Sequence, residues 1–196
     1  MKKIYLVLTV SVLVLLILIF VNLFQSVQQK NTAPGPTQRP TTIEEIKKNY
    51  NSHLSQTLPG KSTISDVTKT NGSPSSVKKI GNKTFFYYDT PVEVFKNIVG
   101  FENGIEYYAL ENIFDDSAGN YKSFVAAYGE PDLTMYDNSP YVWRIFLNSG
   151  IGVQTNNKDV AQILYFIPQK DDIFVNGVAK NVGLSLQPPS PEALHP

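Results

Sequence analysis

The order of predicted elements repeats once along this chain, and the repeat constrains the fold more than any other feature. Gly72-Ser73-Pro74 follows one short helical segment and Gly129-Glu130-Pro131 follows another, and the two glycines are 57 residues apart. An aromatic residue stands 14 positions after each glycine, Phe86 and Trp143, within a run that favours a strand. Each half is therefore predicted to contain a helix, a Gly-x-Pro turn and three antiparallel strands.

The helix in each half is predicted from apolar spacing and from the residues at its ends. In the second half, four apolar residues recur at the helical interval before Gly129, which suits the left-handed position at a helix C-terminus. In the first half, Thr63 and Asp66 can cap a helix over residues 62–70. A further helix over residues 42–54 is predicted from its T-x-x-E capping box. The apolar face of the second-half helix comprises Tyr121, Phe124, Val125 and Tyr128.

The strands are predicted from β-branched and aromatic runs separated by turn residues. They cover residues 84–89, 97–101 and 105–110 in the first half, and 141–147, 150–155 and 160–166 in the second. The Asn103-Gly104 pair predicts a tight hairpin. The alignment of the halves puts Phe86 and Tyr88 on one core face with Trp143 and Ile145, and puts Phe85, Tyr87, Val142, Arg144 and Phe146 on the other face.

The aromatic residues of the strands are the candidate binding residues. Aromatic residues and arginine are enriched at the centres of protein interfaces, so a sheet face that helices leave open could bind another protein. The same residues could instead be buried, one face under helices and the other between modules, because aromatic stripes in strands usually serve packing. The hypothetical protein contacts are Tyr87, Tyr108, Tyr141, Trp143 and Arg144.

An apolar N-terminal run predicts that the chain is held at a membrane. The 21 residues from Ile4 to Phe24 carry no charge, and as a helix they would be about 31 Å long, which matches a bilayer core. A cleaved signal peptide is the alternative, but it usually has a shorter apolar run and a small-residue cleavage site. Because Lys2 and Lys3 precede the run, the N-terminus is expected in the cytoplasm and the remaining chain outside it.

The predicted organisation has five parts. A membrane anchor over residues 1–24, in contact with the lipid bilayer, precedes a proline-rich linker over residues 25–40. Two α+β modules follow, over residues 41–112 and 113–170. Residues 171–196 are expected to form a C-terminal extension with a disordered proline-rich tail. The predicted fold class is thus α+β, with an N-terminal transmembrane helix followed by two tandem modules, each a helix plus a three-stranded antiparallel sheet.

Composition and motifs argue against several classes of function. Cysteine is absent, which excludes disulfides, thiolate zinc sites and cysteine nucleophiles. Beyond the apolar run 15 basic and 17 acidic residues remain, so no basic surface for nucleic acid is expected. The Gly60-Lys61-Ser62 sequence resembles the end of a P-loop, but Ser55 occupies the position of its first glycine, so no nucleotide site is expected.

No catalytic or metal site is predicted either. His53 and His195 lie in polar surroundings without the neighbours that a general base or a metal ligand needs. Three pairs of adjacent acids lie where helix starts or turns favour acidic residues: Glu44-Glu45, Asp115-Asp116 and Asp171-Asp172. We expect no cofactor, no metal and no enzymatic activity.

The first half resembles a known family of envelope proteins. The run from Leu58 to Val67, then Asn71-Gly72-Ser73-Pro74, then the aromatic strand from Thr84 to Tyr88, is similar to the repeat of the SmpA/OmlA (BamE-like) outer-membrane assembly lipoproteins. Two such copies in tandem are similar to β-lactamase inhibitory protein. The resemblance covers residues 42–112, and less closely 117–166; it implies helices packed on an antiparallel sheet that binds other proteins. The chain departs from the family in lacking a lipidated cysteine and in having Asn71 before the glycine.

These observations predict a membrane-anchored, extracytoplasmic module that binds another envelope protein without catalysis and serves envelope organisation or assembly. One alternative is a secreted or tethered inhibitor of an envelope enzyme. A second is a pilin-like structural subunit, although the apolar run lacks the processing glycine and the glutamate that such subunits carry.

Overall fold

The structure, a computed structural model, describes residues 54, 57–114, 118–156 and 158–190. All of them belong to one compact unit, Arg39–Pro196. The predicted span (residues 4–24), the linker (25–40), most of the predicted helix over 42–54, and the end of the tail (191–196) lie outside the described residues.

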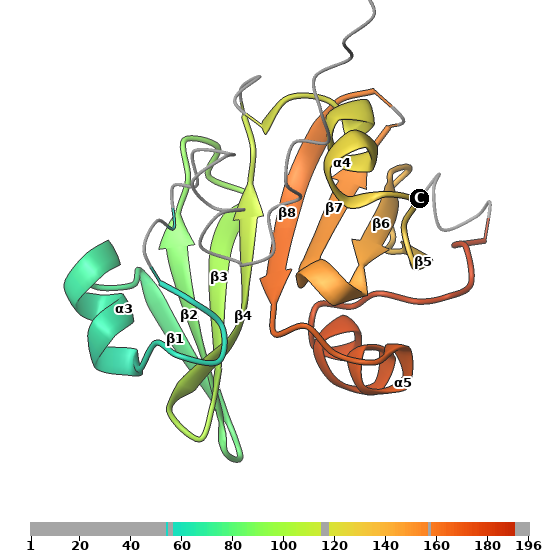
Figure 1. Ribbon diagram of the computed structural model, residues 1–196. Coiled ribbons are helices and arrows are strands. Elements are labelled where there is room, and N and C mark those ends of the chain that lie inside the picture. The colour runs from blue at the N-terminus through green and yellow to red at the C-terminus, as the bar shows by residue number, and fades with distance from the viewer. Residues whose placement is uncertain (1–53, 55–56, 115–117, 157, 191–196) are drawn as a thin grey trace, which may run out of the picture. The chain divides into compact units, whose positions relative to one another are not determined.

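The described strands form one eight-stranded antiparallel sheet (Figure 1). The first half contributes β1 (Ser76–Ile80), β2 (Lys83–Asp89), β3 (Lys96–Glu102) and β4 (Ile105–Asn112). The second contributes β5 (Leu133–Tyr136), β6 (Val142–Phe146), β7 (Ile151–Thr155) and β8 (Val160–Phe166). The spatial order is β1-β2-β3-β4-β8-β7-β6-β5, so each half is a four-stranded meander and the halves meet where β4 pairs with β8.

Short helices flank the sheet. They are α3 (Ile64–Asn71), α4 (Tyr121–Tyr128), the 3-10 turn η2 (Leu147–Ser149), and a continuous C-terminal run made of α5 (Asp171–Phe174) and the π-helical η3 (Val175–Ala179). We call residues 171–181 the C-terminal helix.

The predicted capping residues of the two repeat helices are confirmed. The Thr63 hydroxyl accepts from the backbone N–H of Asp66 at 3.2 Å, and the Asp66 carboxylate accepts from the backbone N–H of Thr63 at 2.9 Å. This hydrogen bond from the Thr63 backbone lowers the pKa of the Asp66 carboxyl. Gly129 follows α4 with φ of 84°, a backbone conformation that favours glycine.

The predicted hairpin at Asn103-Gly104 is also confirmed. Both residues have positive φ, 52° and 82°, as a tight two-residue turn that matches the twist of its strands requires. This turn fixes which residues of β3 and β4 face each other.

The predicted fold class is wrong in its central feature. Two tandem modules with separate three-stranded sheets were expected, but the pairing of β4 with β8, for example Ala109 with Tyr165 and Leu110 with Leu164, merges the halves into one sheet. The expected boundary at residue 112 falls at the end of β4, within the strand pair that joins the halves.

The predicted transmembrane helix over residues 4–24, with its signal-anchor function, lies outside the residues that the structure describes. Across the part of the chain that the structure describes, no helix is both long and apolar enough to cross a bilayer.

Each half contains one strand more than predicted, and the first strand of each half was missed for a different reason. All five residues of β1 are exposed, and two of them are lysines, so neither alternation nor an apolar run marks the strand. The second-half counterpart, β5, is only four residues long.

The predicted sharing of faces between the halves is wrong as well. Phe86 and Tyr88 lie with Phe146 on one face, which we call the helix face, whereas Trp143 and Ile145 lie with Phe85 on the opposite face. The cause is one additional residue between the first two strands of the second half. The strand pair Lys78 and Phe85 of the first half corresponds to the pair Met135 and Trp143 of the second. Met135 stands 57 positions after Lys78, whereas Trp143 stands 58 positions after Phe85. A shift of one residue exchanges the two faces of a strand.

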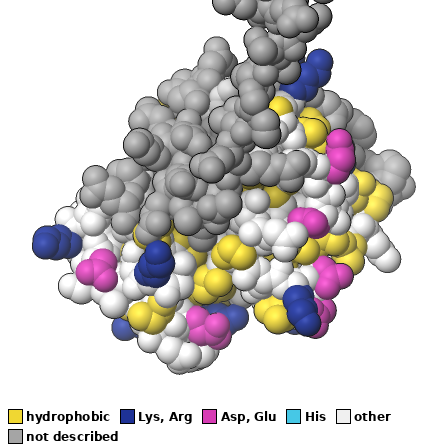
Figure 2. Space-filling view, in the orientation of Figure 1, with side chains coloured by type: hydrophobic (Ala, Val, Ile, Leu, Met, Phe, Trp, Pro, Cys, Tyr) yellow, Lys and Arg dark blue, Asp and Glu magenta, His cyan; other side chains and the backbone are white. Residues whose placement is uncertain are grey.

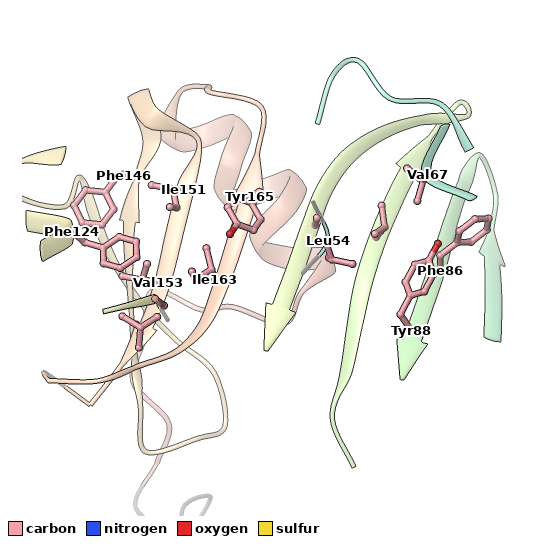
Figure 3. Close-up of a cluster of buried hydrophobic side chains, with 14 of the residues drawn as sticks. Leu54, Val67, Phe86, Tyr88, Phe124, Phe146, Ile151, Val153, Ile163 and Tyr165 are labelled. Atoms are coloured by element: carbon pink, nitrogen blue, oxygen red, sulfur yellow. The ribbon is translucent and has the colours of Figure 1, made fainter. Parts of the chain in front are cut away.

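Both faces of the sheet carry hydrophobic clusters that run across the junction of the halves. On the helix face, side chains of α3 and α4 pack on residues of both meanders, among them those labelled in Figure 3. On the opposite face, Phe174, Val178 and Ala179 of the C-terminal helix pack against Phe85, Tyr108, Trp143, Ile145, Leu164 and Phe166. The C-terminal extension therefore contains a helix that covers the sheet face on which Phe85 lies, a residue predicted to belong to an open face.

Gly100 permits a close approach of two strands on this second face. A Cβ atom added at Gly100 would overlap the ring of Tyr108, a buried residue directly across the β3–β4 pair. We expect Gly100→Ala to lower the free energy of unfolding by about 1–3 kcal/mol, because the ring cannot move without strain.

The matched control is Gly177→Ala in the C-terminal helix, where an added Cβ meets no atom within 4 Å. There we expect a gain of about 0.5–1 kcal/mol from the lower helix cost of alanine. Urea unfolding of both variants measures the difference; equal stabilities would contradict the packing described for Gly100.

Candidate functional site

A groove of about 520 Å³ lies at one end of the sheet, on the face that also carries the C-terminal helix. It lies where β4 and β7 end and where β3, β6 and β8 begin. No residue of the C-terminal helix lines it. The lining residues are Phe95, Asn112, Ile113, Phe114, Asp137, Asn138, Ser139, Tyr141, Gln154, Ala161 and Gln162.

The floor of the groove is a row of three side-chain amides on adjacent strands. Gln154 of β7 is paired with Gln162 of β8, and Gln162 is paired with Asn112 of β4, so the three side chains share one face. The Gln162 amide donates to the Asn112 side-chain carbonyl at 2.7 Å. Because Asn112 and Gln162 come from different halves, the groove exists only in the joined sheet.

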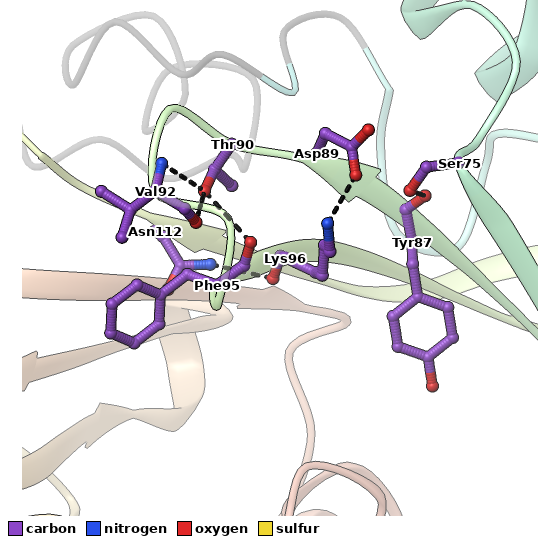
Figure 4. A network of polar contacts seen from close by, with 8 residues as sticks. All are labelled: Ser75, Tyr87, Asp89, Thr90, Val92, Phe95, Lys96 and Asn112. Atoms are coloured by element: carbon purple, nitrogen blue, oxygen red, sulfur yellow. Dashed lines mark hydrogen bonds and ion pairs between the residues drawn. The ribbon is translucent and has the colours of Figure 1, made fainter.

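Asn112 is fixed by further hydrogen bonds to β3. It is buried, and its backbone N–H donates to the Asn97 side-chain carbonyl at 2.8 Å. Its side-chain N–H donates to the Lys96 backbone carbonyl at 2.9 Å (Figure 4). A buried amide with these partners has a fixed orientation, so it holds Gln162 in place.

The loop between β2 and β3 positions one aromatic wall of the groove. The Thr90 hydroxyl hydrogen bonds to the backbone carbonyls of Val92 at 2.8 Å and Phe95 at 3.1 Å, which closes the loop on itself (Figure 4). At its base the Lys96 ammonium lies 2.6 Å from the Asp89 carboxylate, and this hydrogen bond lowers the pKa of the Asp89 carboxyl. The loop thus places Phe95 beside Asn112.

Three exposed aromatic residues form the rim of the groove. Phe95, Phe114 and Tyr141 are 45%, 44% and 37% exposed, and the rings of Phe95 and Phe114 lie 6.0 Å apart between centroids. The neighbouring Val92 and Val94 are also exposed. Apolar side chains gathered at one surface site are typical of interaction surfaces.

Among the described residues that line the groove, Asp137 is the one acidic residue, and it has a structural role. Asp137 accepts from the Ser139 backbone N–H at 2.8 Å, from the Trp143 indole N–H at 2.9 Å and from the Gln154 amide at 2.7 Å. Three donors occupy both its oxygens, so Asp137 orients Trp143 and Gln154 rather than facing a substrate as a general base would.

The same hydrogen bonds leave two acceptors in the floor. The Gln154 amide nitrogen also donates to the Ser139 hydroxyl at 3.1 Å, so both its hydrogens are used. None of the hydrogen bonds of the described residues uses the side-chain carbonyl oxygen of Gln154 or Gln162. A ligand with N–H donors could bind to both.

The five predicted contact residues do not come together. Tyr141 lies on the groove rim, and Tyr87 is half-buried on the same face of the sheet. Trp143 and Tyr108 are each 1% exposed, and burial raises the pKa of the Tyr108 hydroxyl well above its usual value. Arg144 lies on the helix face, where it donates to the Thr134 hydroxyl at 2.8 Å and stacks over a tyrosine ring.

The other groove residues were absent from the sequence prediction, although the sequence carries a weak signal for some of them. Phe95 and Phe114 are bulky apolar residues just outside strand runs, where a core role is less expected. Gln154 and Gln162 interrupt strands that are otherwise largely apolar. Nothing in the sequence shows that these positions meet, because their proximity depends on the β4–β8 pairing.

Of the residues weighed for catalysis and metal binding, the structure describes one pair of acids. His53, His195, Glu44-Glu45 and Asp115-Asp116 lie outside the described residues, and Asp171-Asp172 begin α5. No group of three or more potential metal ligands occurs among the residues that the structure describes. In the view of Figure 2, basic and acidic side chains are interspersed on the described surface.

Comparisons with known proteins add little. No protein-family model matches the chain, and no curated protein matches it. The crystal structure of a DUF4309 family protein (YjgB) from Bacillus subtilis subsp. subtilis str. 168 is similar with a TM-score of 0.41 and 14% sequence identity, over 63% of this chain and 97% of that chain. At this TM-score the likeness supports no conclusion about fold or function.

The role of Asp137 can be tested by removing its carboxylate. In Asp137→Ala the Trp143 indole and the Gln154 amide lose their acceptor, so we expect a loss of about 1–3 kcal/mol in the free energy of unfolding and an altered Trp143 fluorescence spectrum. Glu130→Ala, at an exposed residue outside the groove, is the control and should change neither. An unchanged spectrum in Asp137→Ala would contradict the hydrogen bond to the indole.

Proposed function

We propose that this chain is a non-catalytic protein-binding module and that it binds its partner through the groove. The observation that carries the proposal is the combination, in one groove, of three exposed aromatic side chains with two amide carbonyls that accept no hydrogen bond from the described residues. Aromatic residues contribute much of the binding energy at protein interfaces. The two carbonyls could accept hydrogen bonds from backbone N–H groups, which every extended peptide segment offers.

The occupied carboxylate supports the non-catalytic part of the proposal. Asp137 is the single acidic residue among the groove residues, and its oxygens hold Trp143 and Gln154 in place. The groove therefore presents fixed shape and hydrogen-bond acceptors instead of a group prepared for proton transfer.

The family resemblance supports the same class of function. The SmpA/OmlA-like motifs imply an envelope protein that binds other proteins, and this assignment, with the extracytoplasmic location, stays a hypothesis. The alternative of an inhibitor of an envelope enzyme would use the same groove and differ only in the identity of the partner.

Site-specific crosslinking tests the proposal. A photoreactive phenylalanine analogue replaces Tyr141 on the rim, and in a control protein it replaces Lys122, an exposed residue of α4 on the helix face. We expect a saturable adduct with one protein partner from position 141 and none from position 122. The adduct should disappear when Phe95 and Phe114 are both changed to Ala, although the domain stays folded.

Two results would contradict the proposal. One is the same set of adducts from positions 141 and 122, which would mean non-specific contact. The other is turnover of an envelope glycan or peptide by the purified chain, which would replace the binding module by an enzyme.

A further inference from the structure

We infer that β1 is a docking edge that takes up an acidic, extended segment of a partner protein by strand addition. This surface is separate from the groove: β1 is the first strand of the sheet order, and none of its residues lines the groove. The inference therefore does not depend on the function proposed for the groove.

The backbone of β1 is prepared for a further strand. β1 and β2 are joined by the two-residue turn Gly81-Asn82, and the residues flanking such a turn, Ile80 and Lys83, form a hydrogen-bonded pair. Hydrogen-bonded and non-hydrogen-bonded pairs alternate along an antiparallel ladder, so Val77 and Lys79 direct their N–H and C=O groups away from β2. These four groups form an open edge that one more strand could pair with.

The side chains of β1 leave this edge accessible. All five residues are exposed, and the apolar Val77 and Ile80 are 51% and 55% exposed. Val77 points to one face of the sheet with Phe86, and Ile80 points to the other with Lys83. An added strand would cover apolar surface on both faces in addition to pairing its backbone.

The positive charges of β1 favour an acidic segment as the added strand. Lys78 and Lys79 are adjacent and point to opposite faces, and neither forms an ion pair with any described residue. Lys83, the partner of Ile80, adds a third positive charge on the face of Lys78, with its ammonium hydrogen bonded to Asn181. Two neighbouring acidic residues on a docked strand would lie opposite these lysines on both faces, and opposite charges on neighbouring strands attract.

The other edge of the sheet shows that this fold can cover an edge strand. At β5, Tyr136 and Ser185 exchange two backbone hydrogen bonds of 2.8 Å, so the chain after the C-terminal helix pairs with the strand. Among the described residues nothing pairs with the outer edge of β1. Among the described residues, the outer edge of β5 is therefore partly paired, whereas the outer edge of β1 is not.

A second copy of the chain is a poor occupant. Antiparallel pairing of two β1 strands would bring Lys78 and Lys79 of one copy against the same lysines of the other, and like charges on facing strands repel. Lysine on an edge strand can also act purely to prevent pairing. Binding of an acidic strand distinguishes these roles.

The experiment measures binding of a fluorescent peptide to the full chain by anisotropy. The probe is a nine-residue peptide of alternating threonine and valine with two adjacent glutamates at its centre, and the matched peptide carries two lysines there. We expect saturable binding of the acidic peptide that weakens with added salt, and binding about tenfold weaker or absent for the basic peptide.

Variants of β1 assign the binding to its edge. Val77→Pro removes an outward N–H at an edge position where proline is tolerated, and should abolish binding; Val77→Thr keeps the N–H and should preserve it. The double charge reversal Lys78→Glu with Lys79→Glu should invert the preference between the two peptides. Amide chemical shifts should change at β1 and β2 on binding, and leave Gln154 and Gln162 unchanged.

Three outcomes would overturn the inference. They are no binding of the acidic peptide to a folded chain, equal binding by Val77→Pro, or sedimentation showing a dimer that Val77→Pro dissociates. The first would assign the lysines a purely protective role, and the last would make a second copy the occupant. If Val77→Pro loses peptide binding but still forms the crosslink at position 141, the β1 edge and the groove are independent binding sites.

Discussion

The pairing of β4 with β8 is the interaction on which the rest of the structure depends. Each half is a four-stranded meander with exposed strand edges, and this one antiparallel pair turns two meanders into a single sheet. The hydrophobic cluster on each face contains residues from both halves, so neither half forms a complete core by itself. The amide row of the groove floor also crosses this pair through the hydrogen bond from Gln162 to Asn112. Core and groove therefore share one structural origin.

Unequal covering of the two faces explains where the groove lies. The helix face receives a helix from each half, α3 and α4, as expected for a repeated unit. Among the described residues, the opposite face is covered by the C-terminal helix together with Val182 and Leu184 just after it. The helix reaches β2, where the Lys83 ammonium donates to the Asn181 side-chain carbonyl at 3.4 Å. One short helix cannot cover eight strands. The end of the face that it leaves open carries polar side chains and exposed aromatic rings instead of a continuous apolar surface.

Local signals in the sequence were sufficient for part of this architecture. Short-range chemistry explains three features that were predicted correctly: the capping pair Thr63 and Asp66 of α3, Gly129 after α4, and the Asn103-Gly104 turn. The N-cap of α4, Asn120, was not predicted. The faces of β6 were assigned wrongly because one additional residue in a connection reverses a strand's faces, and an alignment by motif spacing does not detect it. The single sheet was missed because pairing between strands far apart in sequence leaves no local pattern. The groove depends on that same pairing, so of its residues only Tyr141 was anticipated as a contact.

The position of β8 at the end of the repeated region has a consequence for synthesis on the ribosome. The first meander is translated completely before its partner strand exists, so β4 emerges with one side unpaired, together with the buried Glu106 and Glu111 that it carries. Domains fold in the order in which they leave the ribosome, and an unpaired strand edge is a template for pairing with the wrong chain. Until β8 and the C-terminal helix have been translated, the first meander lacks the strand that pairs with β4 and the helix that covers one face. Chaperones that bind the unpaired edge of β4 in this interval would then raise the yield of folded protein.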